Sequence, residues 1–217
     1  MDNISQLLQE AGSSNNEVRA LGEAKIYEAA RSNFGQFIFK CSEELSDDQK
    51  NKSTRFLAAT LIRNMLNFFP DYVGKWEQLG SEVKNQVKNL VLSTLASSHL
   101  DIRKAAALSV AGIYKREHPT DAWKDLIDIL VATCSNSNQN FQTAAIMTLG
   151  YISQEITANE FNIADVDKIL TALITILNDK NAVKDVLKTT LIAFVNYISF
   201  AKKNFENTVN IINYFLI

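Results

Sequence analysis

The sequence predicts an all-α protein in which helical hairpins are stacked into a solenoid, and three observations support this. The 217 residues include only two prolines and seven glycines, whereas folds rich in strands need frequent turn residues. Apolar residues recur every three or four positions, as they do on one face of a helix, and alternating segments are absent. The second helices of successive pairs begin at intervals of about 38, 47, 37 and 45 residues, close to the period of HEAT or armadillo-type repeats.

The clearest repeat lies between Thr120 and Ile156, which we interpret as two helices joined by the polar turn SNSNQN. Asp121 is expected in the first turn of the first helix, where the helix dipole favours a negative charge. The apolar face of that helix consists of Trp123, Leu126, Ile127, Leu130 and Val131. The matching face of the second helix consists of Phe141, Ala144, Ala145, Thr148, Leu149 and Ile152. One hairpin cannot bury both of its faces alone, so a similar hairpin is needed on each side.

In the first half of the chain, helices are predicted for residues 4–10, 16–32, 34–45, 54–69, 81–97 and 101–116. Gly12 ends the first of these helices. Pro70 ends the fourth, because the residue before a proline is pushed out of helical geometry. The segment DYVGKWEQLG, residues 71–80, is expected to be a connection anchored by Trp76.

After the Thr120 hairpin, one more hairpin is predicted from helices at 165–178 and 183–201, and a further helix starts at 206. The expected core face of its second helix is Leu187, Thr190, Leu191, Phe194, Val195 and Ile198. The whole chain is therefore predicted to be a single HEAT-repeat array, with repeats at roughly 1–32, 33–69, 81–116, 120–156 and 164–202 and the start of a sixth. Because a solenoid needs a polar terminal repeat and this chain ends in the apolar NTVNIINYFLI, we expect an N-terminal fragment of a longer array.

The composition argues against several classes of function. The net charge of −2 and the lack of a basic excess argue against a nucleic-acid partner. The sequence contains no run of about 18 or more apolar residues, so no membrane span is expected. The N-terminus MDNISQLLQEAG has acidic residues and no long apolar run, so we do not expect a signal peptide. Cys41 and Cys134 are far apart, and we expect both to be reduced thiols buried in helix packing.

No catalytic residues are predicted. His99 and His118 have no histidine or cysteine at the spacing of a metal site. The glycine motifs that hold phosphates and the nucleophile elbow of hydrolases are also absent from the sequence. We therefore expect a protein that is not an enzyme, uses no metal or cofactor, and acts by binding other proteins along an extended surface.

The helix predicted at 54–69 carries a polar stripe opposite its apolar face. The residues Thr60, Arg63, Asn64 and Asn67 recur at i, i+3, i+4 and i+7. This stripe is either a plain solvent-facing surface or a hydrogen-bonding surface on the concave side of the solenoid.

The first helix of the last hairpin is apolar around most of its circumference, whereas a half-buried helix keeps a polar face. Ile169, Leu173 and Leu177 can serve the core. Leu170 and Ile174 then remain as a semi-exposed apolar strip, and such strips often mark interaction sites. The alternative is that both residues simply pack against a sixth repeat.

Several segments resemble the N-terminal part of the importin-β family (karyopherin-β) of nuclear transport receptors: RFLAATLIRNMLN, SEVKNQVKNLVLSTL, TDAWKDLI, TLGYISQEI, DKILTALI and SFAKKNF, in this order. The resemblance implies a right-handed superhelix of HEAT repeats. It implies that inner helices of the first repeats bind the GTP-bound form of the GTPase Ran, and that outer helices near the fifth and sixth repeats bind phenylalanine-glycine (FG) repeats of nucleoporins. Cargo, or importin-α carrying it, would be held by later repeats that this chain lacks. Such a receptor supports nuclear import of protein cargo and moves between cytoplasm and nucleus through the nuclear pore, with neither nucleic acid nor membrane as a partner.

The resemblance also implies which residues would bind FG repeats. Leu170, Thr171 and Ile174 match one wall of the nucleoporin site, and they include the strip that the hydrophobic pattern singles out. The second wall would lie in the helix after 206. There the chain departs from the family at Asn210, and a shifted register offers Tyr214 instead.

For Ran, the implied contacts on the concave face are Arg63, Asn64, Arg103, Tyr114, Gln154 and Glu155. The first two match a basic residue followed by asparagine in the second repeat, and the last two match the polar end of GYISQEI in the fourth. The family's acidic loop that completes Ran binding lies beyond this chain, so we expect weaker binding than that of a whole receptor.

A rival interpretation of a different class is a HEAT-repeat scaffold that organises a multi-protein complex. Binding of FG peptides, and its loss in Leu170→Asp and Ile174→Asp, separates the receptor from the scaffold. An enzyme has no supporting set of residues in this sequence.

Overall fold

The computed structural model describes residues 3–157 and 160–215, with side chains as far as residue 200 except residue 199. These residues form eleven α-helices and two short 3₁₀-helices and contain no strand, so the predicted all-α class is confirmed. The chain divides into two compact units, unit 1 from Met1 to Arg116 and unit 2 from Glu117 to Ile217. The division falls between the third and fourth predicted repeats.

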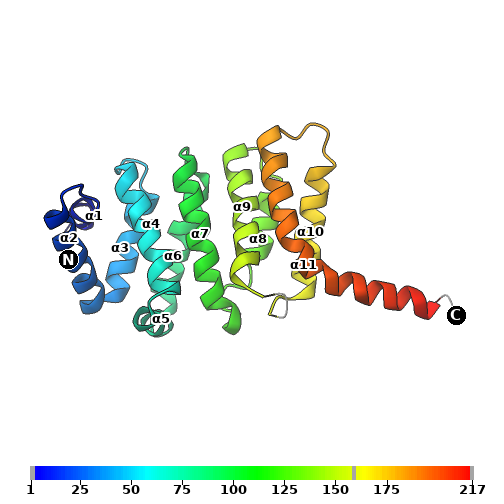
Figure 1. The fold of residues 1–217 in the computed structure, drawn as a ribbon, viewed down its shortest axis with the longest axis horizontal. Coiled ribbons are helices and arrows are strands. Elements are labelled where there is room, and N and C mark those ends of the chain that lie inside the picture. Colours follow the sequence, from blue (N-terminus) through cyan, green and yellow to red (C-terminus); the bar gives the residue numbers. More distant parts are fainter. Residues whose placement is uncertain (1–2, 158–159, 216–217) are drawn as a thin grey trace. The chain divides into compact units, whose positions relative to one another are not determined.

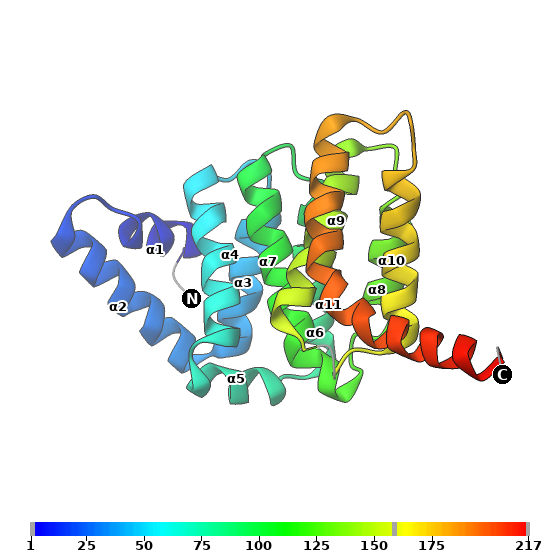
Figure 2. The same ribbon diagram turned by 45° about the vertical axis from the view of Figure 1, so that its right-hand side comes forward.

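The helices of unit 1 are α1 (Ile4–Ala11), α2 (Asn16–Ser32), α3 (Phe34–Ser46), α4 (Lys52–Asn67), α5 (Pro70–Glu77), α6 (Ser81–Ser93), the 3₁₀-helix η1 (Thr94–Ala96) and α7 (Leu100–Glu117) (Figure 1). Helix α1 packs on α2, and α3 packs on both α4 and α6. Ser109 Oγ of α7 donates a hydrogen bond of 3.0 Å to the carbonyl of Ala59 in α4. The first helices α3 and α6 therefore form one layer and the second helices α4 and α7 form the other (Figure 2).

The helices of unit 2 are the 3₁₀-helix η2 (His118–Thr120), α8 (Leu126–Thr133), α9 (Gln139–Glu155), α10 (Ile163–Leu177) and α11 (Lys184–Phe215). Helix α8 packs on α9, and α10 packs on α11. The first helices α8 and α10 also lie side by side, as do the second helices α9 and α11. Unit 2 thus has the stacked-hairpin arrangement that the repeat period predicts.

Asparagine fixes the start of many helices in the described part of the chain. At each of these starts, its side chain accepts a hydrogen bond from a backbone amide of the first turn, which has no partner within the helix. The asparagines are Asn3, Asn15, Asn33, Asn51, Asn138 and Asn162. These local signals explain why the predicted starts of these helices agree closely with the observed ones.

Residues 71–80 were expected to form a connection, and this prediction is wrong because most of them belong to α5. Pro70 is the first residue of this helix, where a missing backbone amide costs nothing. Helix α4 has already ended at Asn67. Tyr72 and Trp76 lie one turn apart and are buried, at 5% and 0% exposure. The anchoring role predicted for Trp76 is confirmed, but it anchors a helix.

The first helix of the Thr120 hairpin begins later than predicted. Asp121 has a left-handed backbone conformation, with φ of 53°, and it ends η2 instead of starting a helix. Aspartate tolerates this conformation better than most residues, because its short side chain can hydrogen-bond locally. Helix α8 starts only at Leu126. Trp123 precedes the helix and is nevertheless buried.

Helix α11 differs from the prediction in length. The sequence pattern ends one helix at 201 and starts another at 206, whereas α11 is continuous from Lys184 to Phe215. Figure 1 shows it extending well beyond the hairpin that it forms with α10.

The face of α11 that packs on α9 also differs from the prediction. Tyr197 is buried, and its hydroxyl donates a hydrogen bond of 3.0 Å to the Leu149 carbonyl of α9. Ala193 faces Gly150, where an added Cβ atom would lie 3.3 Å from the Ala193 Cβ. The buried residues of α11 are Val186, Thr190, Ala193, Tyr197 and Phe200. Leu191, Val195 and Ile198, which were expected in the core, are exposed.

Candidate protein-binding surfaces

The polar stripe of α4 lies beside α7 and is half-buried. Asn67 Nδ2 donates a hydrogen bond of 2.9 Å to the Arg63 carbonyl. The Arg63 guanidinium lies 5.5 Å from the ring centre of Phe68. A side chain at Gly112 of α7 would collide with Asn67 Nδ2, so the glycine allows α7 to approach the stripe closely. Asn64 is half-buried on the same helix.

Two exposed phenylalanines lie at the ends of this stripe, and the helical pattern alone did not single them out. Phe56 is 49% exposed and Phe68 is 60% exposed. Phe56 precedes Thr60 by four residues and so continues the polar stripe on the same side of the helix. The signal in the sequence that could have identified Phe56 is an aromatic residue at helical spacing from a polar stripe. Aromatic side chains often carry much of the binding energy at protein interfaces.

Arg103 and Tyr114, implied as Ran contacts, are both buried, so little of either side chain is available to a partner. Arg103 Nη1 donates hydrogen bonds to the carbonyls of Ser97 and Ser98, at 2.8 and 3.0 Å. These carbonyls follow η1, and carbonyls at a helix end need partners from outside the helix. Burial lowers the pKa of the Arg103 guanidinium below its ordinary value. Arg103 is therefore a structural residue of unit 1.

Gln154 and Glu155 form the end of α9 in unit 2. Gln154 is exposed and Glu155 is half-buried. The implied Ran contacts that remain accessible are therefore divided between α4 in unit 1 and α9 in unit 2.

The apolar strip predicted on α10 is present and accessible. Ile169 and Leu173 are buried as expected, whereas Leu177 is only half-buried. Leu170 is half-buried, and Ile174 is 45% exposed. Thr171, beside them, is exposed as well.

An ion pair shows which side of α10 carries this strip. Lys168 Nζ lies 2.6 Å from Asp128 Oδ1 of α8, and this pairing raises the pKa of Lys168. Leu170 and Ile174 lie on a different side of the helix from Lys168. The strip therefore faces away from α8, toward the open end of unit 2.

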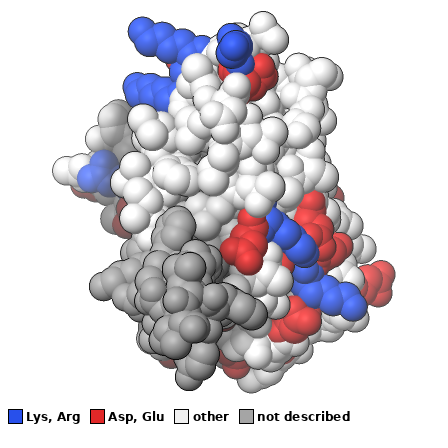
Figure 3. All heavy atoms as spheres, turned by 90° about the vertical axis from the view of Figure 1, so that its right-hand side faces the viewer, with Lys and Arg blue, Asp and Glu red and all other residues white. Residues whose placement is uncertain are grey.

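The open end of unit 2 carries a larger apolar surface than the sequence predicts. Leu191, Ile192, Val195 and Ile198 of α11 are each more than half exposed. Figure 3 views this end and shows a broad surface without charged side chains, with lysine, arginine, aspartate and glutamate gathered at its borders. Asn210 and Tyr214 were expected to form the second wall of the nucleoporin site. Their side chains are outside the part of the chain that the structure describes.

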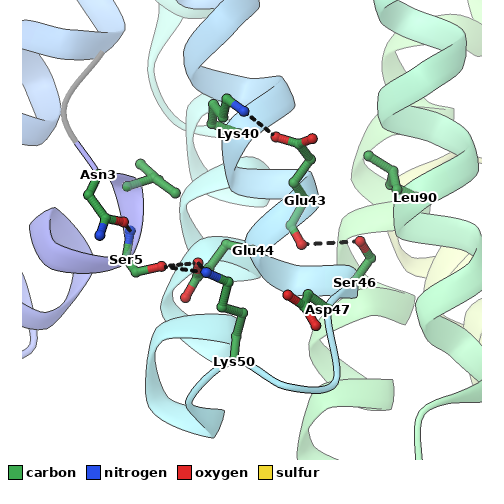
Figure 4. A pocket seen from close by; sticks show the side chains of 10 residues that line it. Asn3, Ser5, Lys40, Glu43, Glu44, Ser46, Asp47, Lys50 and Leu90 are labelled. Carbon is green, nitrogen blue, oxygen red and sulfur yellow. Dashed lines mark hydrogen bonds and ion pairs between the residues drawn. The ribbon is translucent and has the colours of Figure 1, made fainter.

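A polar hollow of about 580 Å³ lies between α1, α3 and α6 (Figure 4). The buried Glu44 carboxylate accepts hydrogen bonds of 2.5 Å from Ser5 Oγ and Thr54 Oγ1. Lys50 Nζ lies 3.2 Å from Ser5 Oγ and 3.9 Å from Glu44. Because Glu44 is satisfied by groups of the protein itself, this cluster ties α1 to α3 and α4 and is structural.

Two further observations on the described residues concern metal binding and the two thiols. These residues contain no group of three histidine, cysteine, aspartate or glutamate side chains that could hold a metal ion. Burial raises the pKa of the Cys134 thiol to about 12. Burial, together with the nearby Glu44, also raises the pKa of the Cys41 thiol. Both thiols are therefore neutral and unreactive at neutral pH. Within the described helices, none has the length and apolar character needed to cross a membrane.

These features define an array of helical hairpins with exposed surfaces suited to protein partners, and comparison with known proteins shows what this array is similar to. Residues 28–97 match the importin-beta N-terminal domain. Importin subunit beta-1 of Arabidopsis thaliana is 28% identical over 209 residues, which are 94% of this chain and 24% of the relative. A structure in which Kap95p binding induces the switch loops of RanGDP to adopt the GTP-bound conformation is similar with a TM-score of 0.86 and 27% identity, over 94% of this chain and 24% of that one. The structure of a Kap95:Nup1 complex is similar with a TM-score of 0.84 and 28% sequence identity. This match covers 98% of this chain and 26% of that one.

The chain is similar to importin-β proteins, and residues 28–97 match the N-terminal domain of that family. Its fold is the HEAT-repeat solenoid of these neighbours, as the repeat period predicts. The chain spans about a quarter of the length of the curated relatives it matches. Those relatives are importin subunits.

Proposed function

We propose that this chain is part of a nuclear transport receptor that binds Ran-GTP on its second helices and FG repeats of nucleoporins on α10. The observation that carries this proposal is the accessible strip of Leu170 and Ile174, which presents apolar groups that the core of unit 2 does not use. The similarity to Kap95p, whose solved structures include complexes with Ran and with Nup1, supports it. Such a protein would move between cytoplasm and nucleus and pass through the nuclear pore.

The chemistry of the α10 strip suits FG repeats. A phenylalanine ring laid on Leu170 and Ile174 gains mainly from burial of apolar surface, about 1.5–3 kcal/mol for each ring that is fully buried. This energy is small enough for fast release, and a disordered chain with many such rings can rebind repeatedly. Thr171 is exposed beside the strip and can hydrogen-bond to the peptide backbone.

We expect Leu170→Asp and Ile174→Asp each to weaken binding of an FG peptide by about tenfold or more, because a carboxylate must then be desolvated beside the ring. Ala132→Asp is the matched control, since Ala132 is exposed on α8 and the strip on α10 faces away from that helix. Surface plasmon resonance with an immobilised FG peptide measures the effect. Equal binding by all four proteins, including the intact chain, would contradict this role of α10.

A packing role for the same surface is the second candidate, because the strip lies at the open end of unit 2 with the exposed residues of α11. In a longer array, a further hairpin could cover Leu191, Ile192 and Val195. The FG experiment separates the two candidates, since a strip used only for packing binds no FG peptide.

For Ran, we expect the double variant Arg63→Ala and Asn64→Ala to bind Ran-GTP about tenfold more weakly, as for the stronger contacts of an interface. Lys40→Ala on α3 is the control, because Lys40 is a cation in the first-helix layer and pairs with Glu43. Discrimination between nucleotide states would come from Ran's switch loops, which are ordered differently in the two states. The proposal fails if the chain binds the GDP and GTP forms equally, or binds neither.

A further inference from the structure

Unit 1 contains a second hollow, formed by α2 and α5, that neither the Ran proposal nor the nucleoporin proposal uses. Its volume is about 550 Å³, and its walls include the rings of Tyr27, Phe69 and Tyr72. The Phe69 ring meets Tyr27 edge-on at 6.0 Å and Tyr72 edge-on at 6.3 Å. Phe69 therefore stands between two other rings in the geometry that aromatic side chains prefer.

The floor of this hollow is firmly packed and its wall is accessible. Tyr72 is buried and stacks on Phe34 of α3 at 5.5 Å. Trp76, one turn further along α5, is completely buried and fixes the helix that carries Tyr72. Phe69, by contrast, is 36% exposed, and Tyr27 is half-buried. An apolar ring in water beside a fixed aromatic floor is a ready contact for another ring.

The rim of the hollow is positively charged. Arg31 follows Tyr27 by one turn of α2, and Lys75 lies on the α5 side. Lys75 Nζ donates a hydrogen bond of 3.0 Å to the Arg31 carbonyl and lies 5.3 Å from the Tyr72 ring centre. Asp71 is the one acidic residue among those that line the hollow. The local charge is thus positive in a chain whose net charge is −2.

We propose that this hollow is a docking site for an acidic peptide segment that carries an aromatic side chain. Phe69 and Tyr27 take the ring of the peptide. Arg31 and Lys75 bind carboxylates on either side of that ring, as charge-assisted hydrogen bonds favour. A volume of this size is typical of pockets that hold a small ligand or a few side chains.

A nucleic acid also combines rings with negative charge, but the charge here fits it poorly. Binding of a single strand needs a positively charged groove that follows the phosphate backbone over several nucleotides. This hollow offers two cations, and the chain has no basic excess. A short acidic peptide needs no more than two cations.

The test uses the full chain and a fluorescent nonapeptide with one central phenylalanine flanked by aspartate and glutamate. Fluorescence anisotropy measures its binding beside two control peptides, one with alanine for the phenylalanine and one with lysine for the acids. We expect each control peptide to bind about tenfold more weakly or worse. Phe69→Ala should weaken binding of the phenylalanine peptide about tenfold and leave that of the alanine peptide unchanged. Arg31→Glu, on the exposed surface of α2, should weaken binding of the acidic peptide and reduce its dependence on salt.

Several results would overturn the proposal. These are equal binding of the phenylalanine and alanine peptides, full binding by both Phe69→Ala and Arg31→Glu, and competition by a single-stranded oligonucleotide. Leu170→Asp separates this site from the proposed nucleoporin site on α10. It should leave binding of the acidic peptide unchanged, and a loss of binding in that variant would assign the peptide to α10. If Phe69→Ala fails to fold, as circular dichroism would reveal, the Arg31→Glu result decides.

Discussion

Replacing Trp76 with alanine should destabilise unit 1 by about 3–5 kcal/mol, the usual cost of removing a large aromatic side chain from a core. Trp76 is completely buried, and Lys84 of α6 lies 5.6 Å from the centre of its ring. Alanine would leave a cavity that the surrounding helices fill only in part. Thermal unfolding followed by circular dichroism measures the effect, and a fall in melting temperature of about 6–20 °C is expected for a chain of this size.

Trp76→Phe is the matched control for this prediction. It keeps a ring in the core and should cost clearly less than the alanine variant. If Trp76→Ala unfolds within about 1 kcal/mol of the intact chain, α5 is not anchored as the structure indicates. The aromatic hollow beside α5 should also lose its floor in the alanine variant, so acidic-peptide binding should fall with stability.

Gly22→Ala should destabilise the hairpin of α1 and α2 by about 2–3 kcal/mol, because the added methyl group has no room. A Cβ atom at this position would lie 2.6 Å from the carbonyl carbon of Glu10 and 2.9 Å from the Cα of Ala11. These are backbone atoms of α1, so relief requires one helix to move away from the other. We expect a fall in melting temperature of about 4–12 °C and faster hydrogen exchange of the α1 amides.

Gly74→Ala is the control for the Gly22 experiment. Gly74 lies within α5, and a Cβ atom there meets nothing within 4 Å. Alanine should therefore be neutral or stabilise the protein by about 0.5–1 kcal/mol, because it loses less conformational freedom on folding. Equal effects of the two alanine substitutions on stability would mean that helix propensity determines the effect of Gly22→Ala, and that the close approach of α1 and α2 does not.

The α10 strip could be predicted from the sequence, but the exposed face of α11 could not. Helix α10 has more apolar residues than one face can bury, so an excess such as Ile174 must be exposed. Helix α11 has apolar residues on two opposite faces, and periodicity cannot choose between them. The buried face of α11 is the one on which Ala193 packs against Gly150 of α9 and Tyr197 donates a hydrogen bond to the Leu149 carbonyl. The small residues at this contact allow α9 and α11 to approach closely.

The two buried Ran candidates illustrate a second limit of the sequence. Arg103 is a charged residue in a helix, and charged residues are usually exposed. Its guanidinium is buried because the carbonyls of Ser97 and Ser98 at the end of η1 need donors. These hydrogen bonds span only six and five residues, but they depend on the turn between η1 and α7, which helical periodicity does not show.

The sequence by itself determined the all-α class, the period of the hairpins, and the starts of the helices that asparagine caps. These properties depend on residues within a few positions of one another, so they can be read locally. The tertiary structure alone decided that residues 70–77 form a helix, since burial of Tyr72 and Trp76 outweighs the weak propensity of a short segment. It also decided which of two apolar faces of α11 is buried and how Phe69 and Tyr72 meet Tyr27. Those outcomes depend on the distance between helices, which is set by side chains far apart in the chain.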